Sequence, residues 1–312
     1  MHAADFQRFI GSIGELTGHQ REMLASVLAG DERTEALALI AARFAELPAC
    51  GHCGSHNVQA WGRRGGLARL RCRDCGRTFN ALTGTPLARL RMRDAWVGYA
   101  RTLVDGLSVR KAARMCGLDP STAFRWRHRF LARIAVTKPE KLDGIVEADE
   151  SYFLRSEKGS RHLDRPARHR GGTGTPANQG HDQVPVLIAC DRFRHTTDAI
   201  MLDKSAASIT AVLEPVVAKD ALLVSDGAPA YRSFANAAGL LHVALAATAG
   251  ERTWGVYHIQ HVNAYASRLR LWMHRFRGVA TRYLASYLGW HRLLDRQRDH
   301  ITAEACLAAA LA

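Results

Sequence analysis

Apolar residues recur every three or four positions at the start of the chain, as they do along one buried face of a helix. This spacing extends from Phe6 to Leu47 and is interrupted at Thr17-Gly18 and at Gly30-Asp31. We therefore predict an N-terminal helical segment over 1–47, made of about three short helices. Such a segment can dimerise, contact DNA or cap the next domain, and the pattern alone favours none of these roles.

A second helical region, 94–136, has the form of a helix-turn-helix after a first helix over Asp94 to Val104. Ser108 can cap one helix, Gly117 can make the turn, and Pro120 can begin the next helix. A plain helical hairpin has a similar pattern. The polar positions of the last helix are Thr122, Arg125, Arg127, His128 and Arg129, and its predicted inner positions are Ala123, Phe124, Trp126 and Phe130.

From Gly144 onward short apolar runs replace the helical spacing and predict the strands of an α/β domain over 144–295. The first strand begins at Ile145, and we expect it to be short and to end at the acidic group Glu147, Asp149 and Glu150. Further strands are predicted over 184–189, 197–202, 221–225 and 241–246, with helices over 206–217, 231–238 and 258–274. Strand, helix and strand in this order imply parallel pairing, with ligands at the carboxyl ends of the strands.

Two segments of this second half lack the pattern of a core. Residues 155–181 are polar, basic and rich in glycine, so we expect a mobile loop there. Residues 296–312 are predicted to form a C-terminal tail.

Charge changes this picture by indicating a partner. The 312 residues include 43 Lys and Arg against 29 Asp and Glu, a formal charge of +14, which favours a polyanion such as double-stranded DNA. No apolar stretch is long enough to cross a bilayer, and the N-terminus has no export signal. We therefore expect no membrane partner and a cytoplasmic protein.

Four of the seven cysteines form two CxxC pairs, Cys50 with Cys53 and Cys72 with Cys75. Without an export signal these pairs predict a metal site and not disulfides, and their spacing is that of a zinc ribbon with one structural Zn²⁺. We assign this ribbon to 48–93.

Arginines surround the second cysteine pair, with Trp61 and Phe79 between them, so the ribbon can bind phosphates as well as serve protein contact. In the helix-turn-helix region, the polar residues near the start of the second helix would enter a major groove. The DNA-binding candidates are Arg69, Arg71, Arg73, Thr122, Arg125 and Arg129.

The acidic residues at the predicted strand ends indicate a catalytic metal site. Asp149 and Asp226 are expected at neighbouring strand ends, and Asn263 shares a helix face with Ser267 and Arg270. Carboxylate and amide oxygens are the ligands of Mg²⁺, and a pair of Mg²⁺ ions can drive an in-line phosphoryl displacement. Glu150 competes with Asp149, although alternation along a strand points the two side chains to opposite faces, so only one should reach the metals. His258 and His261 compete with Asn263.

These segments together resemble the ISXO-like group of zinc-ribbon DDE transposases of bacterial insertion sequences. The resemblance covers most of the chain from Cys50 to about Asp295 and is carried by CGHCG, RCRDCGRTFNALTGTPLARLR, VEADESYF, RHRGG, VPVLIACDR, SDG, HIQHVNAYASRLR and FRGVATRYLASYLGW. It implies a ribonuclease-H-like catalytic core, a Mg²⁺-dependent reaction and the terminal inverted repeats of the element as substrate.

Carried over residue by residue, the resemblance selects Asp149 and Asp226 as the two aspartates and Asn263 as the third ligand. Arg270 stands where the group has Lys, and Ala266 stands where we expect His. An arginine keeps the positive charge but has a planar fork in place of a point charge, so phosphate binding is still expected.

The leading hypothesis is therefore cut-and-join DNA transposition by a bacterial, nucleoid-associated protein that acts on DNA as a homo-oligomer. Water would hydrolyse the phosphodiester at the end of the element, and the exposed 3′-hydroxyl would attack target DNA. A second hypothesis is a non-enzymatic zinc-ribbon and helix-turn-helix regulator, and a third is a nuclease without joining activity. A scaffold would have no need of the set formed by Asp149, Asp226 and Asn263, which favours the enzyme over the regulator.

Overall fold

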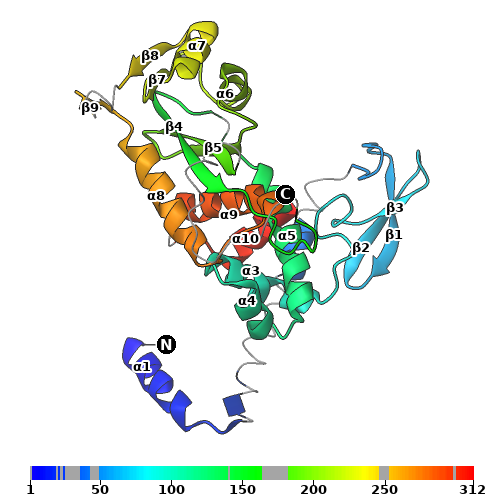
Figure 1. Ribbon diagram of the computed structural model, residues 1–312. Helices are drawn as coiled ribbons and strands as arrows, with labels where there is room; N and C mark the ends of the chain where they lie inside the picture. Colours follow the sequence, from blue (N-terminus) through cyan, green and yellow to red (C-terminus); the bar gives the residue numbers. More distant parts are fainter. Residues whose placement is uncertain are drawn as a thin grey trace. The chain divides into compact units, whose positions relative to one another are not determined.

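The computed structural model of the chain describes residues 2–18, 20–21, 24, 36–42, 49–139, 141–163, 182–245, 253–297 and 300–312. The chain divides into two compact units. Unit 1 contains Met1–Phe130 together with Ile301–Ala312, and unit 2 contains Leu131–His300. Figure 1 shows the helices and strands of both. No helix among the described residues is both long enough and apolar enough to cross a bilayer.

Helices begin unit 1, as the spacing predicts. Helix α1 spans Ala3–Ser12, continues as a 3₁₀ turn over Ile13–Glu15, and has no buried residue. Residues 36–42 are helical, and Ala36 and Ile40 among them are buried. The middle of the predicted segment, 25–35, lies outside the described residues, as do 164–181 of the predicted loop.

A small antiparallel sheet follows, formed by β1 (Val58–Arg64), β2 (Leu67–Cys72) and β3 (Thr78–Phe79) in that order. Gly65 and Gly66 join β1 to β2, and both have a positive φ, which is what a two-residue hairpin turn requires. The hairpin therefore brings the two cysteine pairs to one end of the sheet.

Three helices form the predicted helix-turn-helix region: α3 (Trp96–Val104), α4 (Val109–Met115) and α5 (Pro120–Val136). Ser108 caps α4 by accepting a hydrogen bond from the Lys111 N–H, and Gly117 makes the turn with a φ of +61°. The predicted C-terminal tail contains a helix, α10 (Ala303–Leu311), which packs against α3.

The inner face of α5 differs at two positions from the prediction. Arg127 is fully buried and donates to the Leu107 carbonyl, whereas Phe124 is 37% exposed. The aromatic inner set is otherwise as predicted, since Trp126 and Phe130 both pack against the Tyr99 ring of α3. The helical period leaves one inward position for a long side chain, and the Leu107 carbonyl, in the loop between α3 and α4, accepts a hydrogen bond from its guanidinium.

Unit 2 is built on a five-stranded mixed sheet with the order β6-β5-β4-β7-β8. The strands are β4 (Ile145–Leu154), β5 (Gln183–Asp191), β6 (Thr196–Ile200), β7 (Leu222–Ser225) and β8 (Leu241–Ala244). Strand β5 is antiparallel to both β4 and β6, and β7 runs parallel to both β4 and β8.

Two expectations about this sheet were wrong. Strand β4 does not end at the acidic group but continues to Leu154, because it pairs with β5 along its whole length. Strand β6 and strand β7, which flank helix α6 (Ala206–Leu213) in the sequence, are not neighbours, since β7 pairs with β4. The predicted parallel pairing around a helix holds for β7, α7 (Pro229–Ala238) and β8.

Alternation along β4 separates the two faces of the sheet. Val146 and Ala148 point into a core that includes residues of α6 and α7, such as Ile209 and Phe234. The other face meets α8 (Gln260–His274), which follows the β9 (Thr253–Trp254) and β10 (Tyr257–His258) hairpin. Helix α9 (Leu284–Gln297) packs beside α8 and against β6, and is preceded by a 3₁₀ turn over Thr281–Tyr283. The predicted helix over 258–274 thus begins at Gln260.

Candidate functional site

Asp149 and Asp226 lie on neighbouring parallel strands at the same level of the sheet. The register pairs Glu147 with Val224, so Asp149 and Asp226 each come two residues later. Strand β7 ends at Ser225, which leaves Asp226 at its tip beside the middle of β4. One carboxylate oxygen from each of Asp149, Glu150 and Asp226 lies within 4.8 Å of the others.

The turn after β7 explains why Asp226 stays at this position. Gly227 has a φ of +81°, a conformation that favours glycine, and its N–H donates to the Ser225 hydroxyl. The Asp226 carboxylate accepts from the Ala228 N–H at 3.1 Å, directly before α7 begins with Pro229. A Cβ at Gly227 would come within 3.2 Å of the Ala244 Cβ on β8, so this turn also packs closely on the sheet.

The electrostatics of this edge favour a cation. The pKa of Asp149 is raised to about 6, mainly by burial and also by the neighbouring carboxylates of Glu150 and Asp226, while the Glu150 backbone N–H and Arg270 oppose the rise. Burial also raises the pKa of Glu150. Three crowded carboxylates repel one another unless a cation or a proton lies among them. Their hard oxygen atoms suit a divalent ion such as Mg²⁺.

Glu150 points to the opposite face of β4 from Asp149, as alternation predicts. Its carboxylate accepts a hydrogen bond of 2.7 Å from the Tyr231 hydroxyl on α7. Asp226 follows the end of β7, and its carboxylate lies within 4.8 Å of an oxygen from each of Asp149 and Glu150. The expectation that only one of the latter two reaches the metals stays a prediction. Glu150 therefore remains beside the aspartates as a third carboxylate.

Helix α8 presents Asn263, Ser267 and Arg270 on an exposed face. The Arg270 side chain reaches β4, where its Nε donates to the Ser151 Oγ at 3.2 Å. Ala266, at the position where a histidine was expected, is buried at 7% exposure. Among the described residues, the Asn263 side chain makes no hydrogen bond to Asp149 or Asp226, and the residue is exposed.

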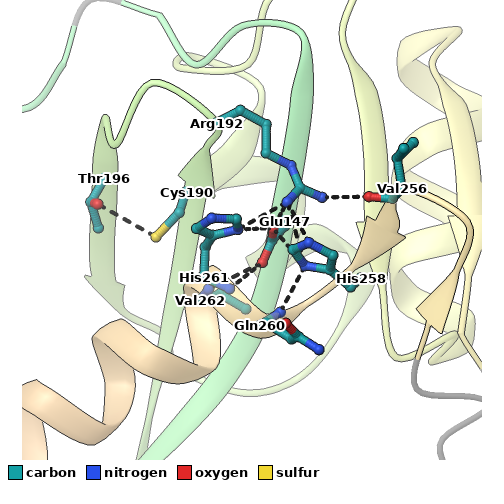
Figure 2. A network of polar contacts seen from close by, with 9 residues as sticks. All are labelled: Glu147, Cys190, Arg192, Thr196, Val256, His258, Gln260, His261 and Val262. Carbon is teal, nitrogen blue, oxygen red and sulfur yellow. Dashed lines mark hydrogen bonds and ion pairs between the residues drawn. The ribbon is translucent and has the colours of Figure 1, made fainter.

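His258 and His261 do not join the aspartates. Their ring nitrogens lie within 4.8 Å of a carboxylate oxygen of Glu147, and together the three residues form a separate group (Figure 2). The Glu147 side chain is fully buried, and from the sequence it was named only as part of the acidic group, without a role. The available signal was its place two residues before Asp149, which puts both carboxylates on one face of β4.

The four cysteines of the two CxxC pairs form a group in unit 1. The Cys50 and Cys75 Sγ atoms are 3.7 Å apart, as are those of Cys53 and Cys72, and all four lie within 4.8 Å. A tetrahedral Zn²⁺ with bonds of about 2.3 Å needs sulfur atoms roughly 3.8 Å apart. The cluster therefore has the donors and the spacing for one structural zinc.

The backbone around the four cysteines also supports a structural zinc site. Gly54 and Gly76, each directly after the second cysteine of a pair, have φ values of +75° and +70°. The Gly54 N–H donates to the Cys50 carbonyl and the Gly76 N–H donates to the Cys72 carbonyl, so the two turns have the same form. The backbone N–H of Cys75 lowers the pKa of Cys72, which favours the thiolate at that position, while desolvation and the three neighbouring thiols raise the pKa of Cys53.

The three ribbon arginines predicted to bind DNA differ in their surroundings. Arg71 lies over the Trp61 ring at 4.7 Å and donates to the Gly76 carbonyl. Arg69 donates to the Thr78 hydroxyl, and Arg73 is exposed and donates to Gln59. The ribbon thus holds these guanidinium groups on its strands.

The predicted DNA-contacting residues of α5 lie near the start of that helix and along its outer side. Arg125 is exposed and donates to the Thr122 hydroxyl at 3.4 Å. Arg129 is also exposed, but it donates to the carbonyls of Pro86 and Ala88, which ties α5 to the segment after the ribbon. Thr122 and Arg125 are therefore the better placed of the three to meet a base edge.

Comparison with known proteins gives the relatives of both units. Residues 141–290 match the ISXO2-like transposase domain, and residues 90–135 match the homeodomain-like domain. The chain is 29% identical over 264 residues, 82% of its length and 88% of the relative, to an uncharacterized protein in the transposable element ISH50 of Halobacterium salinarum.

Two solved structures also align with the chain at 15% identity. They are a pre-cleavage Mos1 transpososome, with a TM-score of 0.25, and the Mos1 mariner paired end complex with Mn, with a TM-score of 0.24. Each alignment covers 69% of this chain and 78% of the other. TM-scores of this size do not establish a shared fold.

The predicted fold class is confirmed. The mixed sheet and the match over 141–290 agree with an α/β class and a ribonuclease-H-like core. The homeodomain-like match over 90–135 agrees with the helix-turn-helix region, and the four-cysteine group agrees with a zinc ribbon.

Proposed function

We propose that this chain, whose residues 141–290 match the ISXO2-like transposase domain, cuts and joins DNA at the terminal inverted repeats of an insertion sequence. The observation that carries the proposal is the meeting of Asp149 and Asp226 on adjacent parallel strands within this domain. The relative from a transposable element supports the same kind of substrate.

Asp149, Asp226 and Asn263 are the residues that we assign to two Mg²⁺ ions, as a DDE-type site with asparagine in the third position. When bound, the ions would activate the attacking oxygen and stabilise the leaving oxygen of an in-line phosphoryl displacement. The two aspartates supply anionic oxygens, and Asn263 on α8 supplies a neutral one. Glu150, within 4.8 Å of both aspartates, adds a third negative charge to the same edge.

Arg270 is assigned to the phosphate beside the scissile bond. Its Nε is bonded to Ser151 on β4, two residues beyond Asp149, so the guanidinium lies along the same strand as the first carboxylate. A guanidinium fork binds two phosphate oxygens at once and has no need of a proton change. It would neutralise negative charge on the phosphate, while the aspartates bind the metal ions at the reacting oxygens.

Unit 1 is proposed to hold the DNA. Thr122 and Arg125 of α5 would read base edges in a major groove, and Arg69, Arg71 and Arg73 of the ribbon, kept in shape by one zinc ion, would bind phosphates. Binding to nonspecific duplex should therefore weaken steeply as salt rises, because phosphate contacts release counterions. Joining two ends to one target requires more than one active site, so we propose a homo-oligomer on nucleoid DNA.

The direct experiment is strand cleavage in Mg²⁺ on duplex DNA that carries the end of the parent element. Wild-type protein should cut at the element end and join that end to a target duplex. Arg270→Lys should keep most of this activity, while Arg270→Ala should lower cleavage about 10- to 100-fold with the same Mg²⁺ half-saturation. Cutting without joining would favour a nuclease, and end binding without cutting would favour a regulator.

A further inference from the structure

A buried carboxylate on β4 connects the sheet to the first turn of α8. Glu147 has no exposed surface, and its Oε2 accepts hydrogen bonds from the backbone N–H groups of His261 at 2.8 Å and Val262 at 3.2 Å. The His261 ring nitrogen Nδ1 lies 2.7 Å from its other oxygen (Figure 2). One side chain thus fixes the start of a helix that is more than a hundred residues away in the sequence.

Helix α8 receives little capping from its own segment. Its N-cap residue, Ile259, makes no side-chain hydrogen bond, and the His258 ring accepts only from the Gln260 N–H, at 3.3 Å. The first N–H groups of any helix lack intrahelical partners. Capping side chains normally come from the same segment of chain. Here the cap comes from a strand, and its negative charge also suits the positive end of the helix dipole.

The spacing of the contacts places Asp149 between two anchors of α8. Glu147 contacts the helix at Val262 and Ser151 contacts it at Arg270. From Glu147 to Ser151 the strand advances about 13 Å, and from Val262 to Arg270 the helix advances about 12 Å. Because the two contacts follow the same order along both elements at nearly equal spacing, β4 and α8 run side by side in the same direction. Asp149 lies midway between the anchors on the same strand face, and Asn263 directly follows Val262.

Arg192, at the end of β5, completes the connection. Its Nη1 lies 3.1 Å from Glu147 Oε1 and donates to His258 Nε2 at 2.7 Å, while Nη2 donates to the Val256 carbonyl at 3.0 Å. The same Nη1 is 3.0 Å from His261 Nδ1. A guanidinium therefore already lies among Glu147, His258 and His261, so we assign the positive charge there to Arg192 and not to a metal ion.

We propose that Glu147, supported by Arg192, is a positioning residue that sets Asn263 of α8 at its working distance from Asp149 of β4. The proposal rests on the proposed function for its catalytic consequence. Glu147 would not touch DNA or metal itself. It would act through the first turn of α8, and a displacement of that turn by about 1 Å is enough to lower a reaction rate about 100-fold.

Hydrogen exchange tests the mechanical part without any activity. In full-length Glu147→Gln, backbone amides of 260–263 should exchange at least about 10-fold faster than in wild type, while those of 266–273 keep their protection. Arg268→Gln is the matched control, because Arg268 joins α8 to Asp295 of α9. It should leave the first turn protected. Unchanged exchange of 260–263 in both Glu147→Gln and Glu147→Ala would overturn the proposal.

A double-mutant cycle tests the catalytic part. Glu147→Gln should lower cleavage at least about 10-fold with unchanged end binding, and it should have little further effect once Asn263 is alanine, because both changes remove the same contribution. Two reductions that simply multiply would assign Glu147 to general stability and contradict positioning. Wild-type protein that cuts nothing would instead refute the proposed function, and the exchange result would still decide whether Glu147 holds α8.

Discussion

At the scale of single residues, the acidic edge of the sheet holds one more carboxylate than the predicted site needs. Asp149 and Glu150 are adjacent in the sequence and point to opposite faces of β4, yet both come within 4.8 Å of Asp226. Their partners distinguish them. The Glu150 carboxylate accepts a hydrogen bond from the Tyr231 hydroxyl. Asp149 lies on the face of β4 that meets α8, where the positive charge of Arg270 lowers its pKa.

The first prediction uses this difference. Asp149→Asn should remove nearly all strand cleavage, at least about 1,000-fold, because it deletes an anionic metal ligand. Glu150→Gln should cost about 10-fold or less, because its amide can still bond Tyr231 and only charge is lost. The measurement compares the rates of strand cleavage in Mg²⁺ of wild type and the two variants, under conditions where each binds the element end equally well. An active Asp149→Asn beside an inactive Glu150→Gln would exchange the roles of the two residues.

The second prediction concerns His291, which is buried in α9 beside the Tyr265 and Trp272 rings. Burial lowers the pKa of His291 from 6.5 to about 4, with help from Arg268 and Arg275 and against Asp295. The unfolded chain therefore binds a proton between pH 6.5 and 4 that the folded chain excludes, so stability falls as pH decreases through this range.

A shift of this size corresponds to about 3 kcal/mol of stability lost by pH 4. Denaturant unfolding of unit 2 at pH 7 and pH 4, followed by tryptophan fluorescence, measures it. In His291→Leu the difference in the free energy of unfolding between pH 7 and pH 4 should shrink by a similar amount. The fold should tolerate this change, because the ring nitrogen Nδ1 makes no hydrogen bond among the described residues. An identical pH response in the variant would contradict the assignment.

At the scale of elements, the ribbon depends on four sulfurs and very little core. Its buried cluster consists of Cys50, Cys72 and Phe79, with a few partly buried neighbours. So small a core does not hold three short strands together without a metal. We therefore predict one Zn²⁺ per chain, and loss of that zinc with unfolding of the ribbon in Cys72→Ser.

Metal analysis and the exchange rates of 58–79 check this prediction. Cys116→Ser is the control, because Cys116 lies outside the four-cysteine group and should leave the zinc content at one. Zinc that remained fully bound in Cys72→Ser would exclude the proposed ligand set.

Another element-level constraint is the close approach of α9 to the end of α5. A Cβ at Gly289 would lie 2.5 Å from the Ala135 Cα and 2.6 Å from the Ile134 carbonyl oxygen. Gly→Ala inside a helix normally stabilises by about 1 kcal/mol. At Gly289 the clash with backbone should reverse the sign and cost about 2 kcal/mol or more.

Thermal or denaturant unfolding of Gly289→Ala measures this cost. Gly11→Ala in α1 is the matched control, since no atom of the described residues outside its own stretch of helix lies within 4 Å of a Cβ at that position, and it should be neutral or slightly stabilising. A stabilised Gly289→Ala would mean that α9 does not pack on α5 through its backbone.

At the scale of the whole molecule, the chain leaves unit 1 at Phe130 and returns to it at Ile301. Helix α10 packs against α3 and buries Cys306, Leu307 and Leu311. The last residues therefore belong to the core that carries the helix-turn-helix region. A change near the C-terminus should weaken DNA binding even though no residue there is expected to touch DNA.

Leu307→Ala is the test, because Leu307 is fully buried and its truncation should cost about 2–5 kcal/mol of unit 1 stability. Binding to element ends should fall in parallel, as measured by gel shift near the midpoint of unfolding. Leu202→Ala, at a position that is 99% exposed, should change neither quantity. Unaltered end binding in a destabilised Leu307→Ala would separate α10 from the DNA-binding core.

What the sequence determined by itself was local. Helical and strand periods, the CxxC spacing and the turn residues depend on neighbours a few positions away, so the ribbon, the helix-turn-helix region and most strands were predictable from them. The tip of β7 was predictable for the same reason, because an apolar run that ends in Ser-Asp-Gly can turn only after the strand.

The tertiary structure decided the contacts between distant segments. The length of β4 depends on pairing with β5, the burial of Arg127 on a carbonyl twenty residues away, and the proximity of Glu150 to Asp226 on where β7 stops. The capping of α8 by Glu147 joins residues 114 positions apart. A pattern of hydrophobicity records which face of an element is buried, but it does not record which polar group on another element will satisfy the donors buried with it.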